Sequence, residues 1–348
     1  MSEIRKVRFG VIGAGLWGGA HAEIYSQHPY AELAAVCDTD AARARQLAAA
    51  HGGARVYTDF REMVRDPGVD AVAVATPDFA HREPIVAAAR AGKHVHTEKP
   101  LATTAEDAEA IAAAVREAGI TLMVDFHARW NPSFAIARRD IEGGRLGRIL
   151  SAYFRLNDTI SVPTSMLSWA ARSSILWFLG SHTVDTLRFL LGDEVQRVYS
   201  VSRAGVLHAL GIDVPDLYQS ILEFRSGVVA SIENNWVVPN TNPAVNDFKV
   251  NILGSKGMIN MDLTNNQLIE RYLPDSSDHP DCIVKPQVFD KHVGFAYESI
   301  RDFVECLALG KPVKVGLEDG LRVTRVVLAI MESAREGRPV MVHYPGQE

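Results

Sequence analysis

The stretch VRFGVIGAGLWGGAHAEIYSQ, residues 7–27, decides the fold of the N-terminal half of this chain. Its first part, Val7–Ile12, is a short apolar and β-branched run, which is typical of a buried strand. Its last part, Leu16–Gln27, has helix-compatible spacing and is followed by His28-Pro29, which ends a helix. Gly13, Gly15 and Gly18 between them form the pattern G-x-G-x-x-G. A strand, a glycine loop and a helix in this order predict a dinucleotide site.

The same alternation of strand and helix continues to about Asp125. Further strands are expected at residues 33–37, 71–75, 94–96 and 120–124, and further helices at 40–51, 83–91 and 105–119. Thr103-Thr104-Ala105-Glu106 is a capping box that opens the last of these helices. Such alternation predicts an α/β fold with a parallel sheet covered by helices.

Beyond Asp125 the pattern changes to period-2 strands with few helices. Strands are expected at residues 149–157, 218–224, 227–238, 248–253, 257–263 and 267–273, and helices at 132–141, 176–191, 296–309 and 317–336. We therefore expect a Rossmann dinucleotide-binding domain over residues 1–125. An α+β domain with a large open, mainly antiparallel sheet should cover residues 126–348. Because helices cover one face of such a sheet, the other face is solvated or buried by another subunit, which favours a homodimer or homotetramer.

Composition excludes several classes of protein. The 348 residues suggest about two domains at the usual ~150 residues each. With 36 basic and 42 acidic residues the net charge is −6, which indicates neither a nucleic-acid nor a membrane partner. Cys37, Cys282 and Cys306 lack disulfide or zinc-knuckle spacing, and no apolar run is long enough to span a membrane. We expect a cytoplasmic protein without a metal.

The dinucleotide site has a second element in Asp38. In the glycine pattern, the first glycine allows a tight turn, the second leaves room for a pyrophosphate, and the third lets helix and strand pack closely. Asp38 follows the second strand, 20 residues after Gly18, where its carboxylate can accept hydrogen bonds from ribose hydroxyls. That charge repels a 2′-phosphate and favours NAD over NADP. Arg43 and Arg45 in the next helix soften this preference.

Glu98-Lys99-Pro100 follows a predicted parallel strand at its carboxyl end, where ligands of open α/β sheets bind. A lysine there can hydrogen-bond a substrate oxygen and exchange a proton with it. A surface-loop lysine is the alternative on the residue alone.

Several short motifs, in this order and spacing, resemble the Gfo/Idh/MocA (glucose-fructose oxidoreductase, inositol dehydrogenase and rhizopine catabolism) family. They are Gly13-Ala14-Gly15, Ala75-Thr76-Pro77, His81, Glu98-Lys99-Pro100 and Gly180-Ser181-His182-Thr183-Val184-Asp185. The resemblance extends over almost the whole chain. It implies NAD(P)-dependent oxidation or reduction of a sugar or polyol.

The resemblance also implies roles for individual residues. Lys99 would hold the reacting hydroxyl, through a Lys99-Pro100 peptide that is often cis in such proteins, and His182 would be the acid/base. The substrate would meet Asp185, Arg129, Trp169 and Arg172. The cofactor would meet Gly13, Gly15, Leu16, Trp17, Gly18, Asp38, Thr76, Pro77, His81, Glu98 and Lys99.

One position departs from the family pattern. Many relatives carry an aspartate four residues before the histidine, where this chain has Phe178, and a phenyl ring cannot orient an imidazolium. Two alternatives to an ordinary dehydrogenase therefore stay open. One is an enzyme that retains NAD and uses transient oxidation for epimerisation, elimination or glycoside cleavage. The other is a non-catalytic dinucleotide-sensing regulator.

Overall fold

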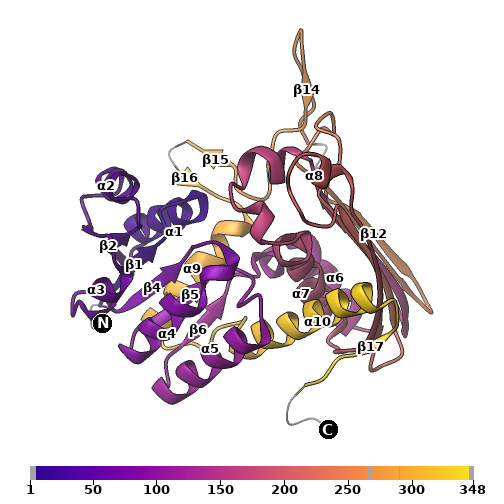
Figure 1. The fold of residues 1–348 in the computed structure, drawn as a ribbon, viewed down its shortest axis with the longest axis horizontal. Helices are drawn as coiled ribbons and strands as arrows, with labels where there is room; N and C mark the ends of the chain where they lie inside the picture. The colour runs from indigo at the N-terminus through magenta and orange to yellow at the C-terminus, as the bar shows by residue number, and fades with distance from the viewer. Residues whose placement is uncertain (1–4, 265–267, 290, 345–348) are drawn as a thin grey trace. The chain divides into compact units, whose positions relative to one another are not determined.

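The computed structural model describes residues 5–264, 268–289 and 291–344, which form two compact units (Figure 1). The first unit holds the described residues up to His127 together with Ala296–Thr324. The second holds Ala128–Phe295 and the described residues from Arg325 onward. The chain first passes from the first unit to the second after His127, close to the expected boundary after residue 125. Residues 296–324, which the sequence analysis assigns to the C-terminal domain, group instead with the first unit.

The first unit is built on a six-stranded sheet in which every paired strand is parallel. Its strands are β1 (Val7–Ile12), β2 (Ala31–Cys37), β3 (Arg55–Tyr57), β4 (Ala71–Val74), β5 (His94–Thr97) and β6 (Leu122–Val124). Their order, β3-β2-β1-β4-β5-β6, is that of a doubly wound dinucleotide-binding fold. This confirms the expected Rossmann architecture. The short strand β3 and the helix after it are not predicted from the sequence, because their apolar runs are too brief.

Five α-helices alternate with these strands (Figure 1). They are α1 (Leu16–Gln27), α2 (Ala41–Ala50), α3 (Phe60–Arg65), α4 (Arg82–Arg90) and α5 (Ala105–Ala118), with a short 3-10 turn η1 (Asp78–Ala80) before α4. Local chemistry fixes their ends. The Asp40 carboxylate accepts the N–H groups of Ala42 and Arg43 at the start of α2, and Thr104 accepts that of Asp107 at the start of α5.

The chain returns to the first unit late in the sequence because apolar side chains pack there. On α9 (Phe295–Leu309), the buried ring of Phe303 lies 6.2 Å from the ring of Phe9 and 4.9 Å from that of His96. The backbone carbonyl of Val315 then accepts a hydrogen bond from Val124 at 3.1 Å. The helix α10 (Leu317–Glu336) begins in this unit and continues into the second.

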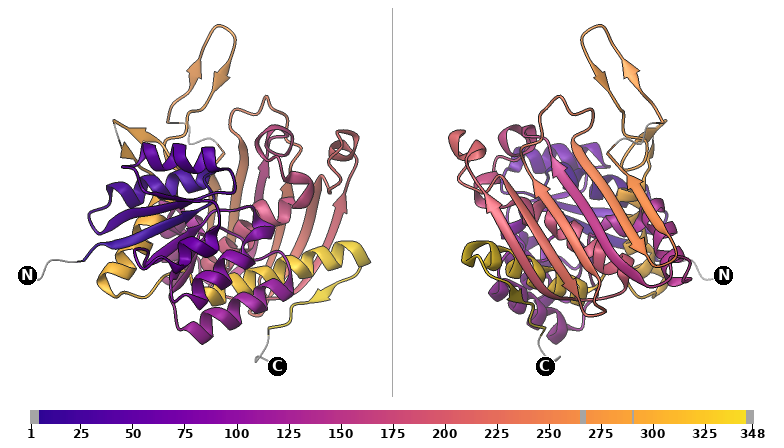
Figure 2. Two further views of the ribbon diagram at one scale, coloured as in Figure 1. Left: turned by 60° about the vertical axis from the view of Figure 1, so that its left-hand side comes forward. Right: turned by 90° about the vertical axis from the view of Figure 1, so that its right-hand side faces the viewer.

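The second unit contains a seven-stranded mixed sheet in the order β12-β11-β7-β10-β9-β8-β17 (Figure 2). Its strands are β7 (Ile149–Asp158), β8 (Val195–Arg203), β9 (Leu217–Phe224), β10 (Val229–Asn235), β11 (Asn246–Gly254), β12 (Met258–Asp262) and β17 (Val340–Met341). Among the described strands of this sheet only β7 and β10 pair in parallel, so the sheet is mainly antiparallel, as expected. The sequence predicts no strand at β8, because the apolar alternation there is weak.

Helices of this unit lie beside one face of the sheet. They are α6 (Pro132–Glu142), α7 (Ser181–Leu191) and the short α8 (Val206–Ala209), with the turns η2 (His127–Trp130), η3 (Val162–Met166), η4 (Ala170–Arg172) and η5 (Leu176–Gly180). The single helix expected over residues 176–191 is divided, because η5 is a π-helical turn that precedes α7.

The opposite face of this sheet carries apolar side chains that are partly exposed. Tyr199 is paired with Ile221 on the neighbouring strand, and Val229 and Leu253 are both paired with Ser151. This register puts the four apolar residues on one face, each about two-fifths exposed. The second view in Figure 2 shows the strands of this sheet from the right-hand side of Figure 1.

Two small hairpins follow β12. They comprise β13 (Arg271–Tyr272) with β14 (Ser277–Asp278), and β15 (Gln287–Val288) with β16 (Lys291–His292). The strand expected over residues 267–273 is therefore reduced to β13, and Gln267 lies outside the described residues. Within the described ranges, none of the helices has the length and apolar character that a membrane crossing requires.

Candidate functional site

The glycine loop between β1 and α1 has the steric properties that the sequence predicts. A Cβ atom on Gly13, whose φ is 99°, would lie 2.5 Å from the carbonyl oxygen of Ala75, and one on Gly18 would lie 1.8 Å from that of Gly13. A Cβ atom on Gly15 would meet nothing within 4 Å. The first and third glycines are therefore needed for packing, whereas Gly15 borders open space that a pyrophosphate can approach.

Asp38 lies against this loop. Its Oδ2 atom accepts the backbone N–H of Ala14 at 2.8 Å, and Oδ1 accepts that of Asp40 at 2.8 Å. The Nη2 atom of Arg43 is 3.8 Å from Oδ1. The strand β2 thus delivers a carboxylate to the point where an adenosine ribose lies in proteins with this loop, and Arg43 partly offsets its charge.

Other residues expected at the cofactor have different surroundings. Leu16 is two-thirds exposed, and the indole of Trp17 stacks on the imidazole of His127 at 5.1 Å. Thr76 donates to the carbonyl oxygen of Ala80 at 3.3 Å, after β4, and Pro77 follows it in the same loop.

His81 links two loops of the first unit. Its Nδ1 atom lies 2.7 Å from the carbonyl oxygen of Pro100, and its Nε2 atom lies 3.1 Å from that of Thr76. The side chain is 1% exposed, and burial lowers the pKa of His81 to about 4. A neutral imidazole in this position joins the loops that follow β4 and β5 through contacts to backbone.

The segment Glu98-Lys99-Pro100 begins directly after β5 and contains a cis Lys99-Pro100 peptide. Lys99 is half-buried, whereas Glu98 is 5% exposed and turns into the unit. Its Oε1 atom lies 3.3 Å from Nε2 of His21, whose Nδ1 atom lies 3.0 Å from the Tyr25 hydroxyl. The carboxyl group of Glu98, which is a predicted cofactor contact, lies in this interior cluster.

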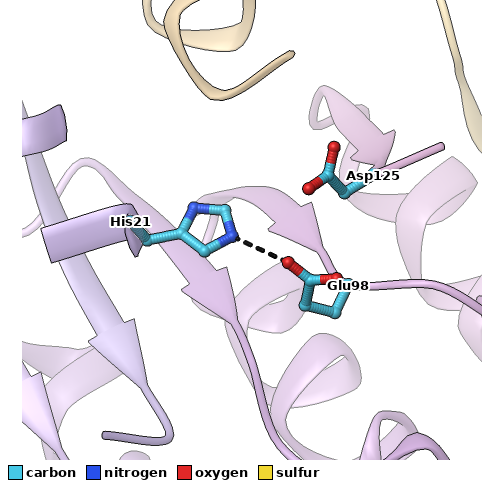
Figure 3. A group of neighbouring side chains, drawn as sticks. All are labelled: His21, Glu98 and Asp125. Atoms are coloured by element: carbon cyan, nitrogen blue, oxygen red, sulfur yellow. Dashed lines mark hydrogen bonds and ion pairs between the residues drawn. The ribbon is translucent and has the colours of Figure 1, made fainter. Parts of the chain in front are cut away.

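Asp125 completes the cluster from the end of β6 (Figure 3). One atom each from His21, Glu98 and Asp125 lie within 4.8 Å of one another, and all three side chains are buried. Burial raises the pKa of Glu98 well above its usual value and lowers the pKa of His21 to about 3. Burial also opposes ionisation of Asp125, but His127 and His96 face its carboxylate and hold its pKa well below the usual value.

In the second unit, α7 carries both His182 and Asp185. His182 is 7% exposed and Asp185 is fully buried. Both oxygens of Asp185 accept hydrogen bonds from Arg129, at 2.9 Å from Nε and 2.6 Å from Nη2. Nη1 of Arg188 lies 3.7 Å from the same carboxylate. Two residues expected to bind substrate therefore form a bidentate ion pair with each other.

Phe178, four residues before His182, lies in an aromatic cluster. The ring of Phe178 lies 6.2 Å from that of Trp169 and 6.0 Å from that of Trp236. The Trp236 Nε1–H group donates to Asp158 at 3.3 Å. Arg172, expected at the substrate, is exposed at the end of η4. Phe178 therefore has two tryptophan rings as neighbours.

Sequence reasoning missed His21, Asp125 and Trp236. Asp125 had a usable signal, since it directly follows a predicted parallel strand, as Asp38 does. His21 had none, because a histidine inside a helix is ordinary. Trp236, at the end of an alternating strand, reads as a core residue.

Comparisons with known proteins match both units. A family model for the oxidoreductase family with an NAD-binding Rossmann fold, GFO_IDH_MocA, matches residues 7–126. The model for its C-terminal alpha/beta domain matches residues 138–342.

Individual relatives match over nearly their full length. A levoglucosan dehydrogenase of Pseudarthrobacter phenanthrenivorans is 30% identical, over 95% of this chain and 97% of the relative. The scyllo-inositol 2-dehydrogenase (NAD(+)) of Bacillus subtilis is 29% identical, over 97% and 96%. The crystal structure of GenD2 from gentamicin A biosynthesis, in complex with NAD, superimposes with a TM-score of 0.87 at 25% identity, over 99% of this chain and 98% of that one.

Proposed function

The chain belongs to the Gfo/Idh/MocA family of NAD-binding oxidoreductases, and we propose that it transfers a hydride between NAD and a secondary alcohol or ketone of a sugar, inositol or related cyclic alcohol. The observation that carries the proposal is the glycine loop, where Gly15 borders open space and Asp38 lies beside Ala14. The curated relatives include a levoglucosan and an inositol dehydrogenase, which supports a cyclic polyol or anhydrosugar as substrate.

The residues of the loop fit a bound dinucleotide. Gly13, Gly15 and Gly18 would hold the pyrophosphate at the start of α1, with Leu16, Trp17, Thr76 and Pro77 around it, and the Asp38 carboxylate would accept from the ribose hydroxyls. When bound, NAD supplies a hydride acceptor. Asp38 favours NAD over NADP because its charge opposes a 2′-phosphate, and the nearby Arg43 reduces that preference.

Two residues of the chain would handle the proton. Lys99 follows β5 at the carboxyl edge of the parallel sheet, and its ammonium group would hydrogen-bond the reacting oxygen as negative charge develops there. His182 on α7 would remove the hydroxyl proton, or return it in reduction. Phe178, four positions before His182, has no carboxylate to support the imidazole, and its ring lies beside those of Trp169 and Trp236.

We further propose that a second copy of the chain covers the open sheet face of the second unit. Tyr199, Ile221, Val229 and Leu253 are partly exposed on that face, and an apolar patch of this kind is typical of a subunit interface. The mass of the native protein in solution tests this directly, since a monomer would contradict it.

The function is tested by the absorbance of reduced nicotinamide when the NAD-loaded protein meets inositols, anhydrosugars, sugars and glycosides one at a time. Signal growing past one equivalent of cofactor supports an ordinary dehydrogenase and identifies its substrate class. A rise that stops at one equivalent or decays favours an enzyme that retains NAD and uses transient oxidation. Binding of NAD with no reaction across the panel favours a dinucleotide-sensing regulator and contradicts the proposal.

A further inference from the structure

We propose that His21, Glu98 and Asp125 form a binding site for one divalent transition-metal ion inside the Rossmann unit, apart from the glycine loop. Figure 3 shows the arrangement: His21 and Glu98 point toward one another, and Asp125 lies beside them. One imidazole nitrogen and two carboxylate oxygens within 4.8 Å of one another are a donor set suited to Zn²⁺, Mn²⁺ or Fe²⁺.

Burial makes this cluster different from a surface group of acids. His21 and Asp125 are fully buried, and Glu98 is 5% exposed. Neither oxygen of Asp125 nor Oε2 of Glu98 receives a hydrogen bond from a residue in the described part of the chain. Buried carboxylate oxygens normally accept hydrogen bonds, and those that accept none carry a large desolvation cost that a bound cation reduces.

Histidine rings face the carboxyl groups of the cluster. His21 faces Glu98 at 3.3 Å, while His96 and His127 face Asp125 at 3.8 and 3.7 Å. A divalent cation would displace the proton of Glu98 and balance the charge of both carboxylates.

The surroundings of His21 also suit a metal ligand. The Tyr25 hydroxyl lies 3.0 Å from Nδ1 of His21. If Nδ1–H donates to this hydroxyl, the Nε2 lone pair is directed toward Glu98 and the centre of the cluster. Histidine ligands in proteins commonly use their second ring nitrogen in this way, which fixes both tautomer and ring orientation.

Metal–ligand bond lengths determine how far the three side chains must move to bind one ion. Zinc–nitrogen and zinc–oxygen bonds of about 2.0–2.2 Å place ligand atoms roughly 3–4 Å apart, so the three side chains would draw slightly together. The ligands come from α1 and from the ends of β5 and β6. A bound ion would tie these elements together and fix the backbone at Glu98, the residue before Lys99.

The test is metal binding by the full-length protein after treatment with a chelator. Equilibrium dialysis against Zn²⁺, followed by elemental analysis, should give about one tightly held ion per chain, and Mg²⁺ in excess should not displace it. Zn²⁺ should also raise the thermal unfolding midpoint. The substitutions Asp125→Asn and His21→Gln should each weaken binding at least about tenfold.

Matched controls come from an exposed pair in the second unit. His208 and Asp213 lie 4.0 Å apart, with side chains 71% and 95% exposed, so His208→Gln and Asp213→Asn remove the same chemical groups without affecting binding. Native protein that retains no Zn²⁺ overturns the proposal, as does unchanged binding in a folded Asp125→Asn variant.

Should the variants fail to fold, Co²⁺ bound to the native protein gives an independent test. X-ray absorption should show nitrogen and oxygen ligands with one imidazole, and sulfur ligation would overturn the assignment.

Discussion

The carboxylate of Asp38 accepts a hydrogen bond from the backbone N–H of Ala14 at 2.8 Å. The contact joins the end of β2 to the glycine loop, two elements that a dinucleotide-binding site must hold together. It also places one negative charge beside the loop, with Arg43 close to it.

Removing the charge of Asp38 should change the choice of cofactor. In Asp38→Asn the side chain still offers an oxygen to Ala14, but no longer repels a 2′-phosphate. We expect the ratio of kcat/KM for NADP to that for NAD to rise about tenfold or more, since about 1.4 kcal/mol corresponds to tenfold. In the control Asp59→Asn, the residue caps α3 and the ratio should stay unchanged. An unchanged ratio in Asp38→Asn would separate this residue from cofactor choice.

The three glycine positions should respond differently to alanine. Gly15→Ala meets no atom of the chain within 4 Å, so the protein should unfold at the same temperature but bind NAD at least about tenfold more weakly. Gly18→Ala forces a contact of 1.8 Å with backbone and should lower the unfolding temperature. Gly19→Ala, which also meets nothing, is the control for both. Scanning calorimetry would measure the unfolding temperatures, and titration calorimetry would measure the affinity for NAD. Normal NAD affinity in Gly15→Ala would contradict a pyrophosphate site at this glycine.

The two proton-handling residues should be essential for turnover but not for cofactor binding. Lys99→Met and His182→Gln should each reduce kcat about 10²–10⁴-fold, because each removes a proton-transfer or oxyanion contact. Fluorescence titration should show NAD affinity near that of the native protein. Lys256→Met, at an exposed turn, serves as the control. Full turnover in either variant would show that the assignment is wrong.

The buried pair of Arg129 and Asp185 should contribute to stability. Asp185→Asn leaves a guanidinium group in the interior without its full partner, which costs about 3 kcal/mol of unfolding free energy. Asp278→Asn breaks the exposed pair with Arg271 and should leave the urea midpoint unchanged. A native midpoint in Asp185→Asn combined with a raised KM would instead support a direct role in substrate binding.

Acid should destabilise the first unit partly through His81. Its folded-state pKa of about 4 lies below the ~6.5 of an unfolded histidine, so the unfolded chain binds the proton first as pH falls. The contribution of His81 to the free energy of unfolding is fully present above pH ~6.5. It is lost as the pH falls from ~6.5 to ~4, by up to about 3 kcal/mol. In His81→Asn the midpoint of urea unfolding should depend less steeply on pH in this window. An unchanged slope would contradict the account.

The glycine loop and the sheet order could be predicted because short-range rules govern them. Strand, loop and helix follow one another from Val7 to Gln27, and the turn geometry needs glycine where it occurs. Strands β7, β9, β10, β11 and β12 of the second sheet could be predicted from their period-2 alternation, whereas β8 could not. The return of residues 296–324 to the first unit could not be predicted, because the sequence of an amphipathic helix does not show which surface its apolar face packs against.

The interior cluster lay beyond sequence reasoning for the same reason. His21, Glu98 and Asp125 come from three distant segments, and only the parallel order of β5 and β6 beside α1 brings them together. Arg129 and Asp185 are predicted from the sequence as substrate-binding residues. Their pairing with each other depends on a contact across 56 positions of sequence.

The most direct test of the central claim follows the hydrogen atom itself. The protein is incubated with NAD and the polyol or sugar that gives the largest absorbance signal, carrying deuterium at the carbon to be oxidised. We expect reduced cofactor one mass unit heavier than with unlabelled substrate, and oxidised product that has lost the label. Reduced cofactor without deuterium would contradict direct hydride transfer.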